Sequence, residues 1–174
     1  EYMKLLWGKE YNEEEKITSS NFVGPSSTTL QLENIRPINS DVSSPNIREN
    51  YSVTDKADGD RKLLFISSNG KIYFINTNMD IQFTGTLSKN KEIWNTLLDG
   101  EHILYDKKKK FINLYTAFDI YYVAGEDVRS NAFIPPNVDD VQINYRLPIM
   151  ESIIKKINAV SVISESSPIP LRIT

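Results

Sequence analysis

Alternating apolar and polar residues in the middle of the chain predict a meander of antiparallel strands. The expected strands cover residues 51–54, 61–67 and 71–76, where β-branched and aromatic residues are frequent. Between the second and third strands, the dipeptide Asn69-Gly70 predicts a tight hairpin turn. The stretch 55–61 contains a glycine among charged residues, and it predicts a tight turn that joins the first strand to the second.

The second half of the chain combines two further strands with two expected helices. Strands are predicted at residues 100–105 and 111–120, joined by a charged hairpin turn at 106–110. Apolar residues at helical spacing predict a short helix over residues 88–98 and an amphipathic helix over residues 147–163. Loops are expected at residues 39–50, 84–87, 123–128, 133–136 and 164–170. Strands therefore outnumber helices in the expected order of elements.

Composition limits the classes of protein to which the chain can belong. Its 174 residues are 40% apolar, which suits one globular domain with a core, or a large part of one. The net charge of −3 provides no general basic field for a nucleic acid, so a polyanion would need a local basic groove. The run Lys107–Lys110 is either a solvated turn or a contact for RNA phosphates.

The scarcity of sulfur and imidazole ligands excludes several kinds of site. The chain has no cysteine, so it has no disulfide, no thiolate zinc site and no thiol nucleophile. Its single histidine, His102, is expected to be structural, and it argues against His-rich metal sites and a Ser-His-Asp triad. No stretch of about 18 apolar residues is present to span a membrane. Because Glu1 is not an initiator methionine, we expect the sequence to be a piece of a longer chain.

A lysine among carboxylates in residues 55–61 is the first candidate for chemistry. The segment reads Asp-Lys-Ala-Asp-Gly-Asp-Arg, with Lys56 at its second position and Arg61 at its end. The three carboxylates favour the protonated lysine unless they face a metal ion or the backbone. A bare K-x-D-G pattern also occurs in ordinary loops, where the lysine is simply solvated. The segment therefore needs support from other parts of the chain.

Three motifs resemble those of the covalent nucleotidyltransferases and follow in the same order. Residues 56–61 are similar to motif I of this family, K-x-D-G-x-R. Residues 99–101, Asp-Gly-Glu, resemble motif III, and residues 115–120, which contain Phe118 and Asp119, resemble motif IIIa. The family comprises the mRNA capping guanylyltransferases and the ATP-dependent DNA and RNA ligases. One motif alone would be weak evidence, whereas an ordered set of three is strong.

A fourth stretch favours the capping enzymes over the ligases. Residues 22–26, followed by Thr29-Leu30 and Asn34-Ile35, resemble a segment that precedes the active lysine in guanylyltransferases and that ligases do not carry there. The lead-in at residues 51–56 also resembles the capping enzymes of large cytoplasmic DNA viruses. The resemblance implies an α+β, ATP-grasp-like nucleotidyltransferase fold, with antiparallel sheets around a nucleotide cleft and helices outside them.

The resemblance also implies a domain organisation. Residues 1–174 would be a partial guanylyltransferase domain, with motifs I, III and IIIa within residues 51–125. Motif IV (E-G-apolar) and motif V (K-x-K) are not found after Asp119, and the C-terminal OB-type lid domain of the family is not present in the sequence. Thr77 stands where cellular capping enzymes usually carry an arginine, which puts one phosphate contact in doubt.

By resemblance, the chain would be an mRNA 5′-capping guanylyltransferase that uses GTP together with Mg²⁺ or Mn²⁺. Lys56 would be the catalytic nucleophile, forming a covalent lysine–GMP intermediate and passing GMP to the 5′-diphosphate end of RNA. The residues expected to bind the nucleotide are Thr54, Asp55, Gly59, Arg61, Glu101 and Phe118. Asp58 and Glu101 would hold the metal, in part through water. Alternatively, Glu101 is a surface residue at a strand end and Phe118 a core residue, while Asp119 is expected to support its strand.

The resemblance implies partners and leaves two alternatives open. In this viral group the domain is commonly joined to an RNA triphosphatase and a guanine-N7 methyltransferase, and it acts in the host cytoplasm or the virion. The first alternative is an ATP-dependent DNA or RNA ligase, because the residues alone do not determine whether the nucleotide substrate is GTP or ATP. The second is a non-catalytic subunit that keeps the fold and binds RNA or a partner protein, which the missing motifs IV and V support.

Overall fold

The computed structural model divides the chain into two compact units. One is built from residues 1–23 and 57–174, and the other from residues 24–56. The residues described are 1–8, 12–38, 45–49, 51–135, 144–162 and 170–174. The loops expected at 39–50, 133–136 and 164–170 lie partly outside them. The boundary between the units falls inside motif I, directly after Lys56.

The smaller unit, residues 24–56, is held by hydrogen bonds from side chains to backbone carbonyls. Its 3₁₀ helix η3 spans Leu32–Asn34, and the Asn34 side-chain amide donates to the Pro45 carbonyl at 2.8 Å. The strand expected at residues 51–54 is wrong, because these residues are exposed and belong to no strand. β-branched residues favour a strand only where a neighbouring strand pairs with them and buries one face.

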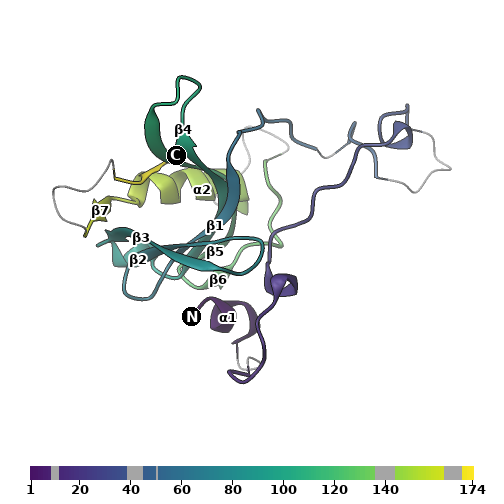
Figure 1. Ribbon diagram of the computed structural model, residues 1–174. Helices are drawn as coiled ribbons and strands as arrows, with labels where there is room; N and C mark the ends of the chain where they lie inside the picture. Colours follow the sequence, from purple (N-terminus) through teal and green to yellow (C-terminus); the bar gives the residue numbers. More distant parts are fainter. Residues whose placement is uncertain (9–11, 39–44, 50, 136–143, 163–169) are drawn as a thin grey trace. The chain divides into compact units, whose positions relative to one another are not determined.

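The larger unit is organised around one eight-stranded sheet (Figure 1). Its strand order is β6-β5-β4-β1-β2-β3-β7, with β8 pairing separately with β5. Each of these pairings is antiparallel except β5 with β8, which is parallel. The elements are α1 (Tyr2–Trp7), η2 (Ser19–Asn21), β1 (Asp60–Ile66), β2 (Lys71–Ile75), β3 (Ile81–Ser88), η4 (Lys91–Ile93), β4 (Thr96–Tyr105), β5 (Phe111–Val123), β6 (Glu126–Asp127), α2 (Arg146–Lys156), β7 (Ala159–Ser161) and β8 (Arg172–Ile173).

Both faces of the sheet are buried, which explains the apolar run Leu63–Ile66 in β1. Leu64 lies in one core cluster together with Ile153 of α2. Leu63 lies in the cluster on the other side, together with Tyr2 of α1. Successive side chains of a strand point to opposite faces, so β1 contributes to both cores at once. The aromatic start of the chain therefore packs on a core.

The helix expected at residues 88–98 is wrong. Only the 3₁₀ helix η4 forms in this stretch, and β4 follows it. Asn95 has φ of 57°, a left-handed conformation that ends a right-handed helix. Leu97 and Leu98 are both fully buried because they enter opposite cores from β4. Adjacent apolar residues of a strand that is buried on both faces imitate helical spacing, and this misled the prediction.

The break expected at residues 84–87 is also wrong, because β3 continues through it. Tyr73 pairs with Phe83 and Lys71 pairs with Leu87, so four steps along β3 oppose two along β2. The extra residues form a bulge, and the glycine within it has φ of 74°. The turn residues in this stretch therefore bend the strand without ending it.

The later elements differ from expectation at their boundaries. The helix α2 ends at Lys156 and not at residue 163, and the following residues form β7, which pairs with β3. The loop expected at 123–128 contains the two-residue strand β6. The strands expected at 61–67, 71–76, 100–105 and 111–120 are confirmed with small shifts of their ends. The α+β prediction is thus confirmed in its coarser form, a mostly antiparallel sheet with few helices.

Candidate functional site

Three sequence motifs meet on three neighbouring strands. Motif I ends on β1, motif III lies on β4 and motif IIIa lies on β5, and β4 is hydrogen-bonded to both of the others. In the register, Arg61 is opposite Glu101, and Glu101 is opposite Thr116. Residues opposite one another in a sheet present their side chains on the same face. Strand pairing therefore brings the three motifs together, although they are far apart in the sequence.

A buried carboxylate holds the motif I arginine at two points. Arg61 Nε donates to Asp99 Oδ1 at 3.1 Å, and an Arg61 terminal nitrogen donates to Asp99 Oδ2 at 2.5 Å. Asp99 is fully buried, and the Tyr121 hydroxyl donates to its Oδ2 at 2.6 Å. These hydrogen bonds raise the pKa of the Arg61 guanidinium, and burial raises the pKa of the Tyr121 phenol. Both groups therefore stay protonated. The two hydrogen bonds from Arg61 to Asp99 fix the plane of the guanidinium.

Two aromatic rings flank the same guanidinium. The Arg61 Cζ atom lies 5.4 Å from the centre of the Phe22 ring and 5.8 Å from the centre of the Phe118 ring. Phe118 is 36% exposed, so it is not a plain core residue. Its predicted contact with guanine stays a prediction. The contacts from Phe22 and Tyr121 were not predicted, because neither residue carries a local signal that relates it to Arg61.

Gly59 brings the chain directly against motif III. A Cβ atom at this position would lie 2.5 Å from the carbonyl oxygen of His102 and 3.0 Å from the Cγ of Glu101. Any side chain would therefore push motif I away from β4. The expected role of Gly59 next to a phosphate stays a prediction, but the requirement for glycine has a structural cause here.

Motif III requires a glycine at position 100 for a different reason, which is the close packing of Tyr115. A Cβ atom on Gly100 would lie 2.6 Å from the Tyr115 ring and 2.5 Å from the Thr116 carbonyl oxygen. The Tyr115 hydroxyl donates to the carbonyl oxygens of Lys62 at 2.9 Å and Leu98 at 3.3 Å. This fully buried tyrosine thus ties β5 to both β1 and β4.

The described geometry brings together only part of the expected site. Gly59, Arg61, Glu101 and Phe118 share one region of the larger unit, where Glu101 is half-buried. Asp58 belongs to the same unit and is exposed. Thr54, Asp55 and Lys56 belong to the smaller unit and are exposed there. The roles of these residues stay predictions.

Asp119 supports its strand, as expected, and its partner was missed. Arg146 Nε donates to Asp119 Oδ1 at 2.8 Å, and an Arg146 terminal nitrogen donates to Oδ2 at 3.1 Å. Arg146 also donates to the carbonyl oxygen of Asn131. Since Arg146 begins α2, this ion pair fastens the helix to the motif IIIa strand.

His102 is buried beside the site and is structural, as expected. Its Nε2 lies 2.9 Å from Asn113 Oδ1, and its ring centre lies 4.5 Å from that of Phe74. Burial lowers the pKa of His102, so the ring is neutral at pH 7. Within the described residues there is no group of three histidine or carboxylate side chains that could hold a metal ion by itself. Nor does any described helix have the length and apolar character needed to cross a membrane.

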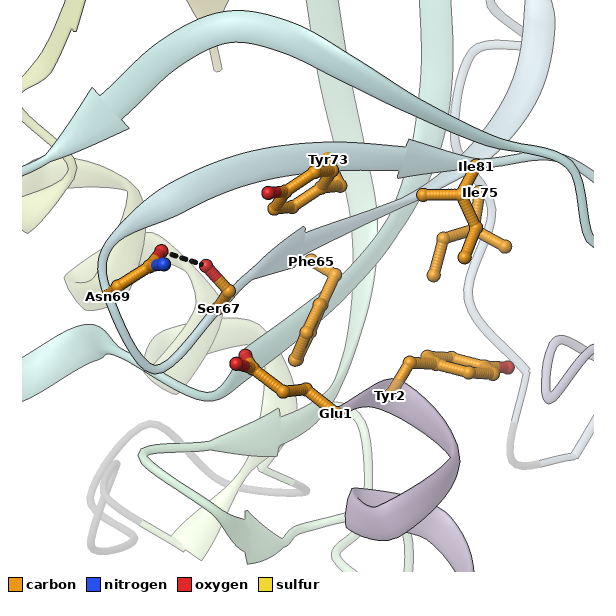
Figure 2. Close-up of a pocket in the computed structure, with 8 residues that line it drawn as sticks. All are labelled: Glu1, Tyr2, Phe65, Ser67, Asn69, Tyr73, Ile75 and Ile81. Atoms are coloured by element: carbon orange, nitrogen blue, oxygen red, sulfur yellow. Dashed lines mark hydrogen bonds between the residues drawn. The ribbon is translucent and has the colours of Figure 1, made fainter. Parts of the chain in front are cut away.

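A separate hollow lies between α1 and the strands β1, β2 and β3 (Figure 2). It has a volume of about 220 Å³, and its apolar walls come from Tyr2, Phe65, Tyr73, Ile75 and Ile81. Among the described residues, those that line it include none of the expected site residues. We therefore do not assign nucleotide binding to this hollow.

Comparisons with known proteins agree with the motifs. Residues 15–164 match the family described as "mRNA capping enzyme, catalytic domain". The chain is also 35% identical over 100 residues to a protein of Acanthamoeba polyphaga mimivirus named "Probable mRNA-capping enzyme". That match covers 58% of this chain and 8% of the mimivirus protein. Because the family match covers most of the sequence, the chain belongs to the mRNA capping enzyme catalytic domain family, as the resemblance to capping enzymes of large DNA viruses predicted.

Proposed function

We propose that this domain is an mRNA 5′-capping guanylyltransferase that transfers GMP from GTP to the 5′-diphosphate end of RNA. The observation that carries the proposal is the cluster of Arg61, Asp99, Glu101 and Phe118 on neighbouring strands, in a chain of the capping enzyme family. An arginine held by a buried carboxylate presents a fixed set of donors, which suits binding of phosphate or ribose oxygens.

In the first step, the Lys56 Nζ atom attacks the α-phosphorus of GTP. A phosphorus–nitrogen bond forms, the bond to the oxygen that bridges the α- and β-phosphates breaks, and pyrophosphate leaves. The amine gives up a proton in this step, and an unperturbed lysine has a pKa of about 10.4, so the site has to favour the neutral form. Positive charge close to Lys56 favours that form, and the phosphate-bound metal would supply it.

In the second step, an oxygen of the terminal phosphate of the RNA attacks the same phosphorus. The phosphorus–nitrogen bond breaks, the cap forms, and the lysine takes back a proton. Arg61 donates to a phosphate or ribose oxygen in both steps, Glu101 accepts from the ribose hydroxyls, and Phe118 stacks on guanine. Gly59 lets the backbone approach phosphate, while Thr54 and Asp55 face the edge of the base.

A divalent cation, Mg²⁺ or Mn²⁺, accompanies GTP in this proposal. The oxygen donors of Asp58 and Glu101 fit such an ion, which takes one or two carboxylates together with substrate phosphates and water. The absence of a three-ligand cluster among the described residues is consistent with an ion that arrives with its nucleotide. Its contribution would be to neutralise charge on the phosphates.

The rest of the capping apparatus is also part of the proposal. Motifs IV and V and an OB-type lid would complete an ATP-grasp-like cleft, and RNA triphosphatase and guanine-N7 methyltransferase domains would act before and after this one. The host cytoplasm or the virion is the proposed location.

Label transfer tests the proposal. The complete protein is incubated with the metal ion and α-labelled GTP or ATP, denatured, and checked for label on the protein. We expect label from GTP and not from ATP, stable to denaturation and lost on mild acid treatment, and none in Lys56→Ala. Lys56→Arg is the matched control, because it keeps the positive charge but cannot act as the nucleophile. Label from ATP alone would instead indicate a ligase, and no label from either nucleotide would indicate a non-catalytic subunit.

A further inference from the structure

The tip of the β4–β5 hairpin carries an unusual density of positive charge. Residues 105–111, called the hairpin tip below, contain four exposed lysines, Lys107–Lys110, and a single acid, Asp106. The chain as a whole has a net charge of −3, so the tip is positive against an acidic background. The hairpin stands out from the rest of the sheet (Figure 1). A local patch of this kind is what a polyanion needs in an acidic protein.

The turn that carries these lysines is tightly tied. Asp106 Oδ1 accepts hydrogen bonds from the backbone N–H groups of Lys108 at 2.8 Å and Lys110 at 2.9 Å. The Asp106 N–H donates to the Lys110 carbonyl, and the Lys109 N–H donates to the Asp106 carbonyl, both at 2.9 Å. Lys109 has φ of 60°, which closes the turn. The Asp106 carboxylate thus accepts hydrogen bonds from the turn backbone, and the four lysine side chains extend from a turn of fixed conformation.

Aromatic side chains lie directly beside the lysines. Tyr105 and Phe111 are opposite each other in the register, and their ring centres are 5.6 Å apart at an angle of 69°. Tyr105 is 56% exposed and the adjacent Leu104 is 40% exposed. A turn that served only for solubility would not need exposed aromatic and aliphatic groups. Single-stranded nucleic acid binds to this combination, because bases stack on aromatic rings while lysines contact the phosphates.

The hairpin tip is connected to the candidate site along one face of the sheet. Glu101, Ile103 and Tyr105 are alternate residues of β4, so their side chains share the face on which Arg61 lies. Four residues of a strand span about 13 Å, which separates Tyr105 from Glu101. On the neighbouring strands, Arg172 of β8 is in register with Leu114 of β5, between the tip and the site.

We propose that the hairpin tip binds the single-stranded RNA acceptor, a few nucleotides downstream of its 5′-diphosphate end. This inference rests on the proposed guanylyltransferase function, and it adds where the RNA lies. Tyr105 stacks on a base, and Lys107–Lys110 contact the phosphates that follow. Recognition is independent of sequence, because stacking and phosphate contacts do not distinguish the bases.

The test compares two charge-matched variants of the complete protein. One carries Lys→Gln at positions 107, 108, 109 and 110, and the control carries Lys→Gln at four exposed lysines elsewhere: Lys16, Lys71, Lys89 and Lys155. Binding of a 5′-labelled, unstructured 5′-diphosphate RNA is measured by fluorescence anisotropy over a range of salt concentrations. We expect the first variant to bind at least about tenfold more weakly, and its salt dependence to lose about three units of slope, since each phosphate contact contributes about 0.7 for single strands.

Two further measurements complete the test. Tyr105→Ala should weaken RNA binding roughly tenfold without changing the salt slope, because it removes stacking and no charge. Self-labelling with GTP should be unchanged in all of these variants, which reports on folding and on the first step separately. If wild-type protein fails to label, the proposed function fails, and the RNA comparison still decides this inference. The inference would be overturned if RNA binding weakened equally in both lysine variants, or in neither. It would also be overturned if polyglutamate, an acidic polymer without bases, competed for the protein as well as unlabelled RNA does.

Discussion

Arg61 and Asp99 form a two-point ion pair in which the Asp99 side chain is fully buried and the Arg61 side chain is 26% exposed. The arginine comes from motif I and the aspartate from motif III, so the pair joins residues that are 38 positions apart in the sequence. Tyr121 adds a third hydrogen bond to the carboxylate. These hydrogen bonds fix the orientation of the Arg61 guanidinium, and a site that binds phosphate or ribose oxygens needs donors in fixed positions.

Replacing the arginine should destabilise the fold strongly. Arg61→Met leaves the buried Asp99 carboxylate without its cation, and breaking a buried pair in this way costs about 3–5 kcal/mol of the free energy of unfolding. Urea denaturation measures the loss. Arg129→Met is the control, because Arg129 and Asp127 form a pair that is nearly half exposed and worth less than about 1 kcal/mol. Equal losses in the two variants would contradict the structural account of the pair.

Gly100→Ala should be destabilising by at least about 2 kcal/mol, because the new methyl group has to displace the buried Tyr115 ring and the Thr116 carbonyl. Gly8→Ala is the comparison. Gly8 has φ of 56° and ψ of −126°, a conformation that only glycine adopts readily, but no atom lies within 4 Å of a Cβ atom there. The variant therefore reports on backbone strain alone, about 1–3 kcal/mol. Thermal denaturation of both variants separates the two effects. A Gly100→Ala protein as stable as the wild type would show that Tyr115 does not pack as described.

The stability of the domain should fall as the pH drops below about 6.5. Burial lowers the pKa of His102 in the folded state from its ordinary value of 6.5, nearby Lys62 lowers it further and Asp60 opposes the shift. In the window between the two values the unfolded chain binds a proton that the folded chain does not, so up to about 1.4 kcal/mol per pH unit is lost. The loss should be present in the wild type and absent in His102→Gln when both are unfolded with urea between pH 5 and 7. Parallel curves for the two proteins would be evidence against it.

Phe118 and Phe22 allow the predicted base contact to be tested with a matched pair. Both rings flank the Arg61 guanidinium, but only Phe118 is proposed to stack on guanine. Phe118→Leu should raise the KM for GTP roughly tenfold in the labelling reaction, while Phe22→Leu should change it little. Similar effects from both would mean that the rings act only through the arginine.

The sequence was informative where function depends on residues close together in the chain. The glycines and charged residues of motifs I and III could be found in this way. So could the strands β1, β4 and β5, on which the motifs lie, and the neighbouring strand β2. Each of these signals is local, since a turn dipeptide, an alternation or a short motif needs no knowledge of the rest of the fold. The family match agrees with that interpretation.

Other features depend on tertiary contacts, and the sequence could not predict them. Phe22 and Tyr121 contact the Arg61–Asp99 pair, and Arg146 pairs with Asp119, but no spacing in the sequence relates them to these partners. The strand expected at residues 51–54 was wrong because strand formation needs a partner, and the helix expected at 88–98 was wrong because Asn95 adopts a left-handed conformation. In these cases the surroundings decide the conformation, and local propensity does not.

The most direct test of the account is to identify the residue that carries the nucleotide. The complete protein is incubated with GTP and the divalent cation, digested under alkaline conditions that preserve a phosphoramidate, and analysed by tandem mass spectrometry. We expect GMP attached to the Lys56 side chain and to no other residue. Attachment to a different lysine, such as the neighbouring Lys62, or a complete absence of adduct, would contradict it.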